Sequence, residues 1–297
     1  MKNKHKTNNN SLHFTVKEAT ELLPFLLEVM PNRSRNSVKS ILTRGQITVD
    51  DHLETKHNYP LKPGQTVIVL KNKAAIKQDQ LIGMSILYED NDIIVINKEA
   101  GLLSIATKKE KQQTAHNQLM EYVRKQDPQN RIFVVHRLDK ETSGVMMFAK
   151  SEKIKRKMQD DWKHVVKERT YVALVEGKVE KQAGTISSWL RETKTHLMYS
   201  SNDKNGQHAV THYKVTQSNN EFSLLEVQLE TGRKNQIRVH MKDLGHPIVG
   251  DKKYGATSNP LRRLGLHAKI LSFHHPETNQ LLLFKADVPK SFLVKAK

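Results

Sequence analysis

The nine residues His136-Arg137-Leu138-Asp139-Lys140-Glu141-Thr142-Ser143-Gly144 lie between two short apolar stretches, 133–135 and 145–149. Both flanking stretches contain valine and phenylalanine, so they predict two strands joined by a charged loop. A carboxylate at a strand end, on a loop that contains glycine, is well placed to meet a ligand. On these residues alone, Asp139 is equally compatible with a charged turn whose side chain accepts backbone N–H groups.

Around this loop, the chain predicts more strands than helices. Strands are expected at 93–96, 171–175, 210–215, 223–229 and 281–284, and helices at 114–125, 151–166 and 235–244. In the helix predicted at 151–166, one apolar stripe contains Ile154, Met158, Trp162 and Val165. Strands and helices do not alternate regularly, which favours an α+β domain with a mixed or antiparallel sheet over a doubly wound fold.

The first quarter of the chain has a compact pattern of its own. Pro24 interrupts an apolar stretch, so a helix there bends or starts late. A second helix is expected around Val38, Ile41 and Leu42, with Gly45 ending it, and short strands follow at 47–49 and 67–69. The polar stretch 71–83 lacks periodicity and is typical of a linker.

The chain is strongly basic. Its 297 residues contain 49 Lys and Arg against 31 Asp and Glu, a formal net charge of +18. Residues 1–80 hold 13 of these basic residues and 7 of the acidic ones, and the remainder is basic as well. The charge therefore favours a polyanion such as nucleic acid as the partner, contacted by both parts of the chain.

Composition also excludes several kinds of site. The chain has no cysteine, which rules out disulfides, zinc–thiolate sites, iron–sulfur clusters and thiol nucleophiles. No helical His-x-x-x-His pair backed by a glutamate occurs among the 15 histidines, so no metal site is expected. No apolar stretch approaches the roughly 20 residues that span a bilayer, and no apolar signal core follows the N-terminus. We therefore expect a cytoplasmic protein without a membrane partner.

Two further stretches could carry chemistry. Residues 231–240, TGRKNQIRVH, open a predicted helix, and a helix N-terminus beside Arg and Lys can bind a phosphate. Lys234, Arg238 and Lys242 are equally compatible with a solvated basic face, although Arg238 could point into a cleft and pair with a carboxylate. Residues 167–174, KERTYVAL, start a strand at Tyr171, which could pack or stack on a base.

In their order along the chain, these stretches resemble the RluA-type RNA pseudouridine synthases. The matching stretches are 97–101, HRLDKETSG, RTYVALVEG, TGRKNQIRVH, GDKKYG and RLGLHA, and the resemblance covers about residues 87–288. Residues 32–51 and 63–70 resemble the small RNA-binding module of the ribosomal protein S-four type. The resemblance implies an α+β RNA-binding module at 13–72 and an α+β catalytic domain at 86–297. Composition adds a disordered basic tail at 1–12 and a linker at 73–85.

The resemblance implies that a monomeric enzyme isomerises uridines in structured RNA, above all ribosomal RNA, to pseudouridine. The base is cut from ribose, turned and rejoined through carbon, a reaction that needs neither a cofactor nor a metal. Asp139 corresponds to the catalytic aspartate, which acts as a nucleophile or as a base. Arg238 corresponds to its ion-pair partner, and Tyr171 to the aromatic residue that stacks on the flipped base.

The resemblance also implies further RNA contacts. Arg137 corresponds to the residue that enters the base stack or contacts phosphate, and Arg233 and Lys234 to phosphate contacts. In the front module, the expected RNA-binding residues are Arg33, Arg35, Lys39 and Arg44. The chain departs from the usual pattern at Asn235, where a His is usual, and at Asp50-Asp51, where Asn-Gly is usual.

Two other functions remain compatible with the sequence. A non-catalytic RNA-binding or ribosome-assembly factor would show the same charge and the same front module. A metal-dependent nuclease or deaminase would also act on nucleic acid, but the lack of cysteine and of a His-x-Glu signature counts against it.

Overall fold

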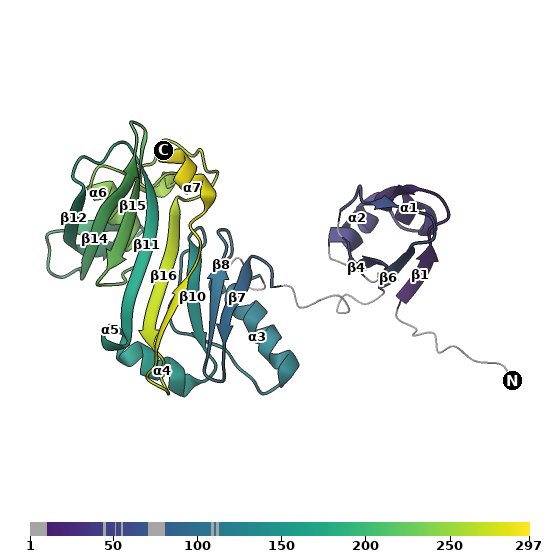
Figure 1. Ribbon diagram of the computed structural model, residues 1–297, viewed down its shortest axis with the longest axis horizontal. Coiled ribbons are helices and arrows are strands. Elements are labelled where there is room, and N and C mark those ends of the chain that lie inside the picture. Colours follow the sequence, from purple (N-terminus) through teal and green to yellow (C-terminus); the bar gives the residue numbers. More distant parts are fainter. Residues whose placement is uncertain are drawn as a thin grey trace. The chain divides into compact units, whose positions relative to one another are not determined.

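The computed structural model describes residues 11–43, 46–50, 52–54, 56–70, 81–107, 110 and 113–297. The chain divides into two compact units, Met1–Gln80 and Leu81–Lys297, each with its own hydrophobic core (Figure 1). Residues 73–80 of the predicted linker lie outside the described residues. The first strand of the second unit, β7, begins at Met84, two residues before the predicted start of the catalytic domain.

The first unit combines a small sheet with two helices. Its elements are β1 (Ser11–Thr15), β2 (Thr20–Glu21), α1 (Leu22–Val29), α2 (Arg35–Thr43), β3 (Ile47–Val49), β4 (His52–Leu53), β5 (Pro60–Leu61) and β6 (Thr66–Leu70). The main sheet is antiparallel in the order β1-β6-β3-β4, and β2 pairs with β5. Residues 11 and 12 of the predicted tail are the start of β1, and residues 1–10 lie outside the described residues. Pro24 falls in the first turn of α1, where its missing N–H costs no helical hydrogen bond.

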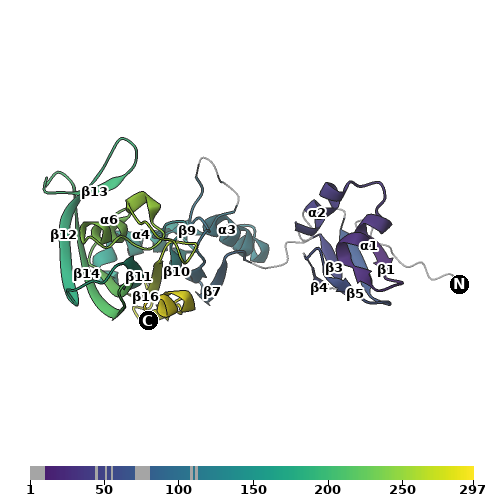
Figure 2. The ribbon, with the colours of Figure 1, turned by 90° about the horizontal axis from the view of Figure 1, so that it is seen from above.

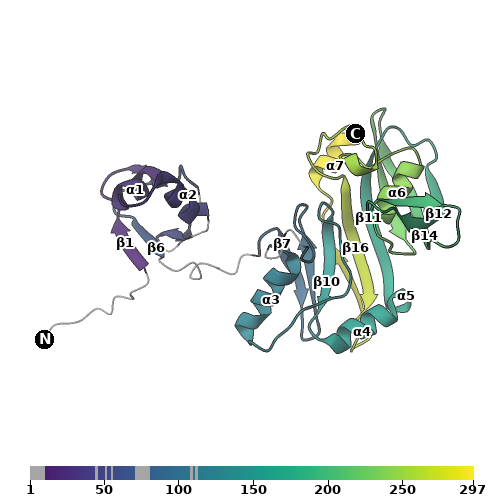
Figure 3. The same cartoon turned by 180° about the vertical axis from the view of Figure 1, so that it is seen from behind.

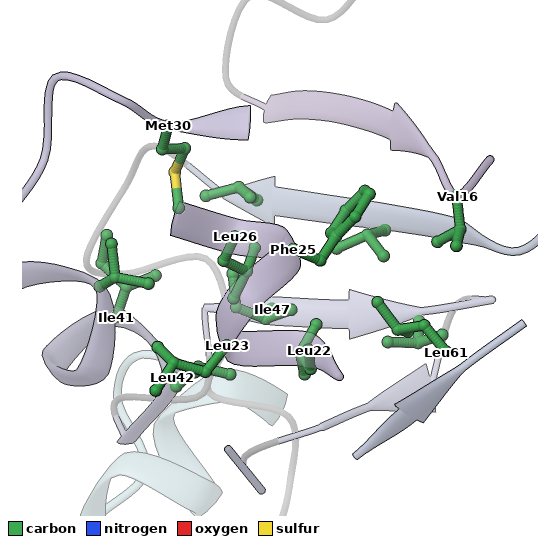
Figure 4. Packing of buried hydrophobic residues seen from close by; sticks show 14 residues of the cluster. Val16, Leu22, Leu23, Phe25, Leu26, Met30, Ile41, Leu42, Ile47 and Leu61 are labelled. Carbon is green, nitrogen blue, oxygen red and sulfur yellow. The ribbon is translucent and has the colours of Figure 1, made fainter. Parts of the chain in front are cut away.

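The core of the first unit forms where α1 and α2 pack on the sheet. Figure 4 shows Leu22 and Leu26 of α1 beside Ile47 of β3, with Leu42 of α2 at the same core. After β3, Asp50 has a left-handed φ of 48°, which Asp and Asn tolerate better than most residues. Its carboxylate accepts hydrogen bonds from the backbone N–H of Thr66 and the side chain of Gln65, both at 2.8 Å. The acid that replaces the usual asparagine therefore ties β3 to β6. Asp51 and the predicted helix stop Gly45 lie outside the described residues.

One large sheet dominates the second unit. Its strands are β7 (Met84–Glu89), β8 (Ile93–Lys98), β9 (Phe133–Val134), β10 (Ser143–Ala149), β11 (Val166–Glu176), β12 (Ala183–Glu192), β13 (Met198–Ser201), β14 (Gln207–Ser218), β15 (Phe222–Leu229), β16 (Leu266–His274) and β17 (Leu281–Lys285). The order is β13-β12-β14-β15-β11-β16-β10-β8-β7, with β17 on β16 and β9 on β10. Only β10 and β16 pair in parallel among the described strands. The fold is therefore α+β with a mixed, mostly antiparallel sheet, as predicted. Figure 2 shows β12 and β13 at the far end of this sheet.

The pairing register places residues of five strands in one row across the sheet. Gly144 of β10 pairs with Lys98 of β8 and with Ala268 of β16, and Ala268 in turn pairs with Tyr171 of β11. Tyr171 also pairs with Val227 of β15. Gly144 has a φ of 115°, and a Cβ there would overlap the backbone of Ala268. Glycine is thus required at 144, and it brings the loop that precedes β10 close to Tyr171.

Helices cover both faces of the sheet. The helices of this unit are α3 (Ala115–Gln126), α4 (Glu152–Asp160), α5 (Trp162–Val165), α6 (Gln236–Asp243), the 3₁₀ turn η1 (Lys252–Tyr254) and α7 (Lys290–Lys295). Buried residues of α3 and α6 belong to two clusters that both contact Tyr171, so these helices share a face, as Figure 3 shows. Residues of α4 and α7 pack with side chains that point to the opposite face. None of the described helices has the length and apolar character needed to cross a bilayer.

Three local features of the second unit differ from the prediction. The helix expected at 151–166 is broken at Asp161, whose ψ of 27° is not helical, because β11 begins directly at Val166 and Asp is a weak helix former. Ser143 and Gly144, expected in a turn, are the first residues of β10. Strands β7, β12, β13 and β16 were not predicted. In β12, for example, few residues are apolar, so the sequence shows little of the alternation that marks a strand.

We predict that Gly144→Ala lowers the free energy of unfolding by more than about 3 kcal/mol, because the added Cβ overlaps backbone atoms and the φ is unfavourable for alanine. The measurement is denaturant-induced unfolding. Gly255→Ala is the matched control. Gly255 also has a positive φ, of 93°, but open space around it, so its substitution should cost only about 1 kcal/mol. Equal losses in the two variants would contradict a steric requirement at 144.

A pH-dependent stability is expected from His240. This residue is fully buried between Thr211 and Ser188, with ring nitrogens 2.8 and 3.0 Å from their hydroxyls. Burial lowers the pKa of His240 to about 4, against an unfolded value of about 6.5. Between these values the unfolded chain binds more protons, so stability rises with pH across this window and is lost as the pH falls.

Over that window the His240 contribution amounts to roughly 3 kcal/mol. We therefore expect His240→Gln to unfold with a flatter pH dependence between pH 6.5 and 4 than the wild type. His164→Gln, at a histidine whose side chain is 84% exposed, should leave the dependence unchanged. Unfolding free energies measured across this pH range check both, and an unaltered slope in His240→Gln would refute the assignment.

Candidate active site

The loop that carries Asp139 is fixed by hydrogen bonds on both sides of the aspartate. Ser104 Oγ donates to the carbonyl oxygen of Leu138 at 2.7 Å, and Lys140 accepts from the backbone N–H of Gly101 at 2.8 Å. Thr142 N–H donates to the carbonyl oxygen of Asp139 itself at 3.1 Å. The Asp139 side chain is 31% exposed, so it can meet a substrate from a backbone that is held in place.

Lys98 provides a further clamp on this loop. Its ammonium group is fully buried and donates to the carbonyl oxygens of Glu99, Leu102 and Lys140, at 2.9, 2.8 and 3.1 Å. Burial lowers the pKa of Lys98 to about 8, and the negative charges of Glu141 and Asp139 oppose this fall. Lys98 thus links the end of β8 to the residue that follows Asp139.

Arg238, on α6, lies between two carboxylates. Its Nη1 donates to Asp139 Oδ2 at 3.3 Å, while Nε and Nη2 both bind the carboxylate of Asp251 at 2.7 Å. Burial opposes the charge of Arg238, but Asp251 and then Asp139 outweigh it and raise its pKa. The Asp251 side chain is only 1% exposed. The bidentate pair with Asp251 therefore holds the guanidinium, and Asp139 accepts a hydrogen bond from the third guanidinium nitrogen, Nη1.

Asn235 and Tyr254 both contact the guanidinium of Arg238. Tyr254 is buried, and its ring centroid lies 4.9 Å from the guanidinium carbon of Arg238. Asn235 donates to the Tyr254 hydroxyl at 3.0 Å and accepts from Arg238 Nη1 at 3.3 Å. It also has a φ of 55°, a left-handed conformation that asparagine tolerates. The asparagine that replaces the usual histidine thus contacts the arginine directly.

Asp139, Arg238 and Tyr171 line one cavity of about 440 Å³. Burial raises the pKa of Tyr171, the nearby Asp139 adds to the rise and Arg169 opposes it, so the phenol is protonated at neutral pH. The remaining wall includes Leu138, Thr142 and Leu266. The structure therefore brings together the three residues that the sequence placed 32 and 67 positions apart.

The other predicted contact residues, Arg137, Arg233 and Lys234, also line this cavity, but their side chains have different partners. Arg137 is exposed, and Arg233 donates from Nε to the carbonyl oxygen of His208 at 3.0 Å. Lys234 forms a 2.6 Å ion pair with Glu192, so its charge already has a protein partner. Lys242 is exposed. Of the three basic residues spaced by four, only Arg238 points into the site.

The predicted residues of the front module belong to the first unit. Arg33 and Arg35 are exposed, and Lys39 is half-buried on α2. Arg44 lies outside the described residues. These residues belong to the first unit, whereas the residues that line the Asp139 cavity belong to the second.

Sequence reasoning missed three residues that hold this site. They are Asp251, Lys98 and Ser104. Asp251 lies in the stretch GDKKYG, which composition identified only as a turn, and η1 does follow it. No local pattern marks its pairing with Arg238, since the two lie on different elements.

One cluster has metal-ligating residue types. Asp90, Asp92 and His275 lie within reach of one another, and His275 Nε2 lies 3.0 Å from Asp90. His275 Nδ1 accepts the backbone N–H groups of Glu277 and Thr278, at 3.3 and 3.1 Å. Nδ1 therefore acts as an acceptor, whereas buried Nε2, although 3.0 Å from Asp90, makes no hydrogen bond of good geometry within the described residues. A ligating histidine usually donates from its second nitrogen, so the surroundings of Nδ1 do not fit a metal site.

Comparisons with known proteins agree on one family. A family model described as RNA pseudouridylate synthase matches residues 92–243. RNA pseudouridine synthase YlyB of Bacillus subtilis is 34% identical over 272 residues, covering 90% of this chain and 89% of that protein. Ribosomal large subunit pseudouridine synthase D of Nitrosomonas europaea is 31% identical over 297 residues, covering 95% and 86%.

Solved structures agree with the sequence comparison. Human RNA pseudouridylate synthase domain containing 4 has a TM-score of 0.58 and 26% identity, covering 70% of this chain and 90% of that one. The human domain containing 1 protein has a TM-score of 0.56 at the same identity, covering 70% and 84%. The chain belongs to the RNA pseudouridine synthase family, of the RluA type that its ordered motifs resemble.

Proposed function

We propose that this protein isomerises specific uridines of ribosomal RNA to pseudouridine, with Asp139 as the catalytic carboxylate. The observation that carries the proposal is the position of Asp139 Oδ2, 3.3 Å from Arg238 and in one cavity with Tyr171. The family supports the reaction. The name of ribosomal large subunit pseudouridine synthase D, borne by relatives from Nitrosomonas europaea and Vibrio cholerae, supports the RNA class.

The reaction exchanges one bond for another. The glycosidic bond from C1′ to N1 breaks and a bond from C1′ to C5 forms, while N1 gains a proton and C5 loses one. Nothing is oxidised, reduced or hydrolysed, so the proposed chemistry needs no cofactor. Asp139 must be ionised to act, either as a nucleophile toward the sugar or base, or as a base toward the sugar. The guanidinium of Arg238 lies 3.3 Å from this carboxylate, whose side chain is partly exposed.

The neighbours of Asp139 have distinct proposed roles. Arg238 holds the carboxylate by an ion pair, and Tyr171 offers its ring to the uracil of a uridine flipped out of the RNA. Flipping costs a few kcal/mol, which contacts to the extruded base and to the vacated stack offset. Arg137, at the exposed rim of the cavity, is placed to supply the second kind of contact.

We further propose that the first unit is the RNA-binding module that the sequence resemblance implies. Exposed Arg33 and Arg35 at the start of α2 support this role. The basic excess of residues 1–80 supports it as well, because phosphate contacts dominate the affinity of RNA-binding proteins.

Replacing Asp139 tests the proposed reaction. Asp139→Asn keeps the shape but removes the charge, and we expect turnover to fall at least a thousandfold, about 4 kcal/mol of barrier. The measurement is release of tritium from C5 of uridine in bulk ribosomal RNA isolated from cells that lack the protein. Equal rates in wild type and Asp139→Asn would exclude Asp139 from the mechanism and favour a non-catalytic RNA-binding factor.

Replacing Asp251 tests how Arg238 is held. In Asp251→Asn the guanidinium loses its bidentate charged partner, and a displaced ion pair should lower kcat by about 10- to 100-fold. The folded protein should remain, with reduced stability. Asp203→Asn is the matched control, because Asp203 pairs with Arg191 on the surface at 2.5 Å and should leave tritium release unchanged. Full activity in Asp251→Asn would show that Arg238 is positioned without it.

The front module makes a prediction about salt. In the double variant Arg33→Gln, Arg35→Gln, loss of two phosphate contacts should flatten the slope of log affinity against log salt by about 1.4 to 1.8. Binding to the same RNA between 50 and 200 mM salt is the measurement. A double variant at exposed Lys290 and Lys297 of the second unit controls for net charge alone. Equal slopes in the wild type and the Arg33, Arg35 variant would mean that these arginines make no phosphate contact.

A further inference from the structure

A second cavity, of about 700 Å³, adjoins the catalytic cavity. The two cavities share Arg137, Tyr171 and Arg233 along their common wall. The second cavity is lined further by the junction of α4 and α5 and by residues 229–232. Its volume falls within the range of about 300 to 1,000 Å³ that is usual for small-ligand sites. A group the size of a nucleotide, attached to a uridine in the first cavity, could therefore enter the second.

Trp162 lines this second cavity directly after the break in the helix at Asp161. Its indole packs against the buried cluster that contains Ile154 and Met158, and its ring centroid lies 5.3 Å from that of His136. Burial, with the nearby charge of Arg169, lowers the pKa of His136 to about 3, so this imidazole is neutral. Its Nε2 accepts the backbone N–H of Met147 at 3.1 Å. The indole thus packs at an interplanar angle of 46° against the fixed, uncharged ring of His136, the residue that precedes Arg137.

Arg169 lines the same cavity without a carboxylate partner. Its Nη2 donates to the carbonyl oxygens of Leu229 and Glu230, at 3.0 and 2.9 Å, and its guanidinium carbon lies 5.9 Å from the Trp162 ring centroid. A side chain at Gly232 would press on Nη1, so the glycine leaves the guanidinium its place. None of the described carboxylates forms an ion pair with Arg169. A partly desolvated cation whose described partners are carbonyl oxygens and an aromatic ring favours an anion from solution.

The carboxylates that line this cavity do not act as the anionic partner of Arg169. Asp161 contacts His164 at 2.5 Å and Glu230 contacts His212 at 2.6 Å, so both carboxylates are engaged at the rim. Asp160 is exposed at the end of α4. The remaining charged groups of the lining, besides His164, are cations: Arg137, Lys163 and Arg233.

We propose that this cavity binds the nucleotide that flanks the target uridine, with its base stacked on Trp162 and its phosphate paired with Arg169. The proposal rests on the proposed function, because it assumes that the catalytic cavity holds a uridine of the same strand. Stacking tolerates any base, since every base has a π face. The first cavity then selects uridine, and the second binds its neighbour with little base preference.

Substitutions at Trp162 test the stacking. Loss of one base–aromatic stack of about 1–3 kcal/mol should raise KM for tritiated ribosomal RNA about tenfold in Trp162→Leu, with kcat unchanged within twofold. Trp162→Phe keeps a ring and should recover most of the affinity. Trp189→Phe is the control, at the chain's other tryptophan. Trp189 lies in β12 and packs on His208 of β14. Thermal melts of all variants show whether each one folds.

Substitution of Arg169 tests the phosphate contact. In an Asp139→Asn background, Arg169→Gln should flatten the salt slope of RNA binding by about 0.7, the value for one phosphate of a single strand. Trp162→Leu in the same background should weaken binding and leave that slope unchanged. A fall in kcat without a rise in KM at Trp162, or an unaltered slope at Arg169, overturns the proposal. Absence of tritium release by the wild type would instead refute the proposed function, while the binding measurements would still decide the second cavity.

Discussion

The close contact between Gly144 and the backbone of Ala268 is the constraint on which the site depends. It occurs where β10 and β16 run in parallel for two residue pairs in an otherwise antiparallel sheet. Because Ala268 also pairs with Tyr171, three neighbouring strands bring the Asp139 loop and the aromatic ring to the same row. Any side chain at 144 would separate these strands, and the pocket between loop and ring would be lost.

Electrostatics then determines how the aspartate is presented. Arg238 is bound more closely by buried Asp251 than by Asp139, so the structure anchors the cation from the interior and leaves the other carboxylate partly exposed. The same division applies to the loop backbone, which Lys98 and Ser104 hold from the inside. A carboxylate that is both fixed and accessible is what the proposed nucleophilic or general-base chemistry on a flipped uridine would require.

The basic charge of the chain has two different uses in this arrangement. Some cations pair with protein groups, as Lys234 does with Glu192 and Arg238 with Asp251. Others face the two adjoining cavities without a carboxylate partner, as Arg169 does beside Trp162. Net charge alone indicates a polyanion, but only the second group can bind one. Under the proposed function, the two cavities therefore indicate the RNA-contacting part of the catalytic unit more closely than the charge does.

The sequence by itself determined the α+β class, the strands on both sides of Asp139, the helix that carries Arg238 and, through its ordered motifs, the family. These features depend on local apolar periodicity and on short motifs, which are readable in one dimension. The tertiary structure alone decided that Asp251, and not Asp139, is the principal partner of Arg238, that Lys98 clamps the loop, and that Trp162 of the predicted stripe also lines a cavity. Such contacts join residues on separate elements, and strand register and helix ends, set by packing across the whole sheet, determine which of them meet.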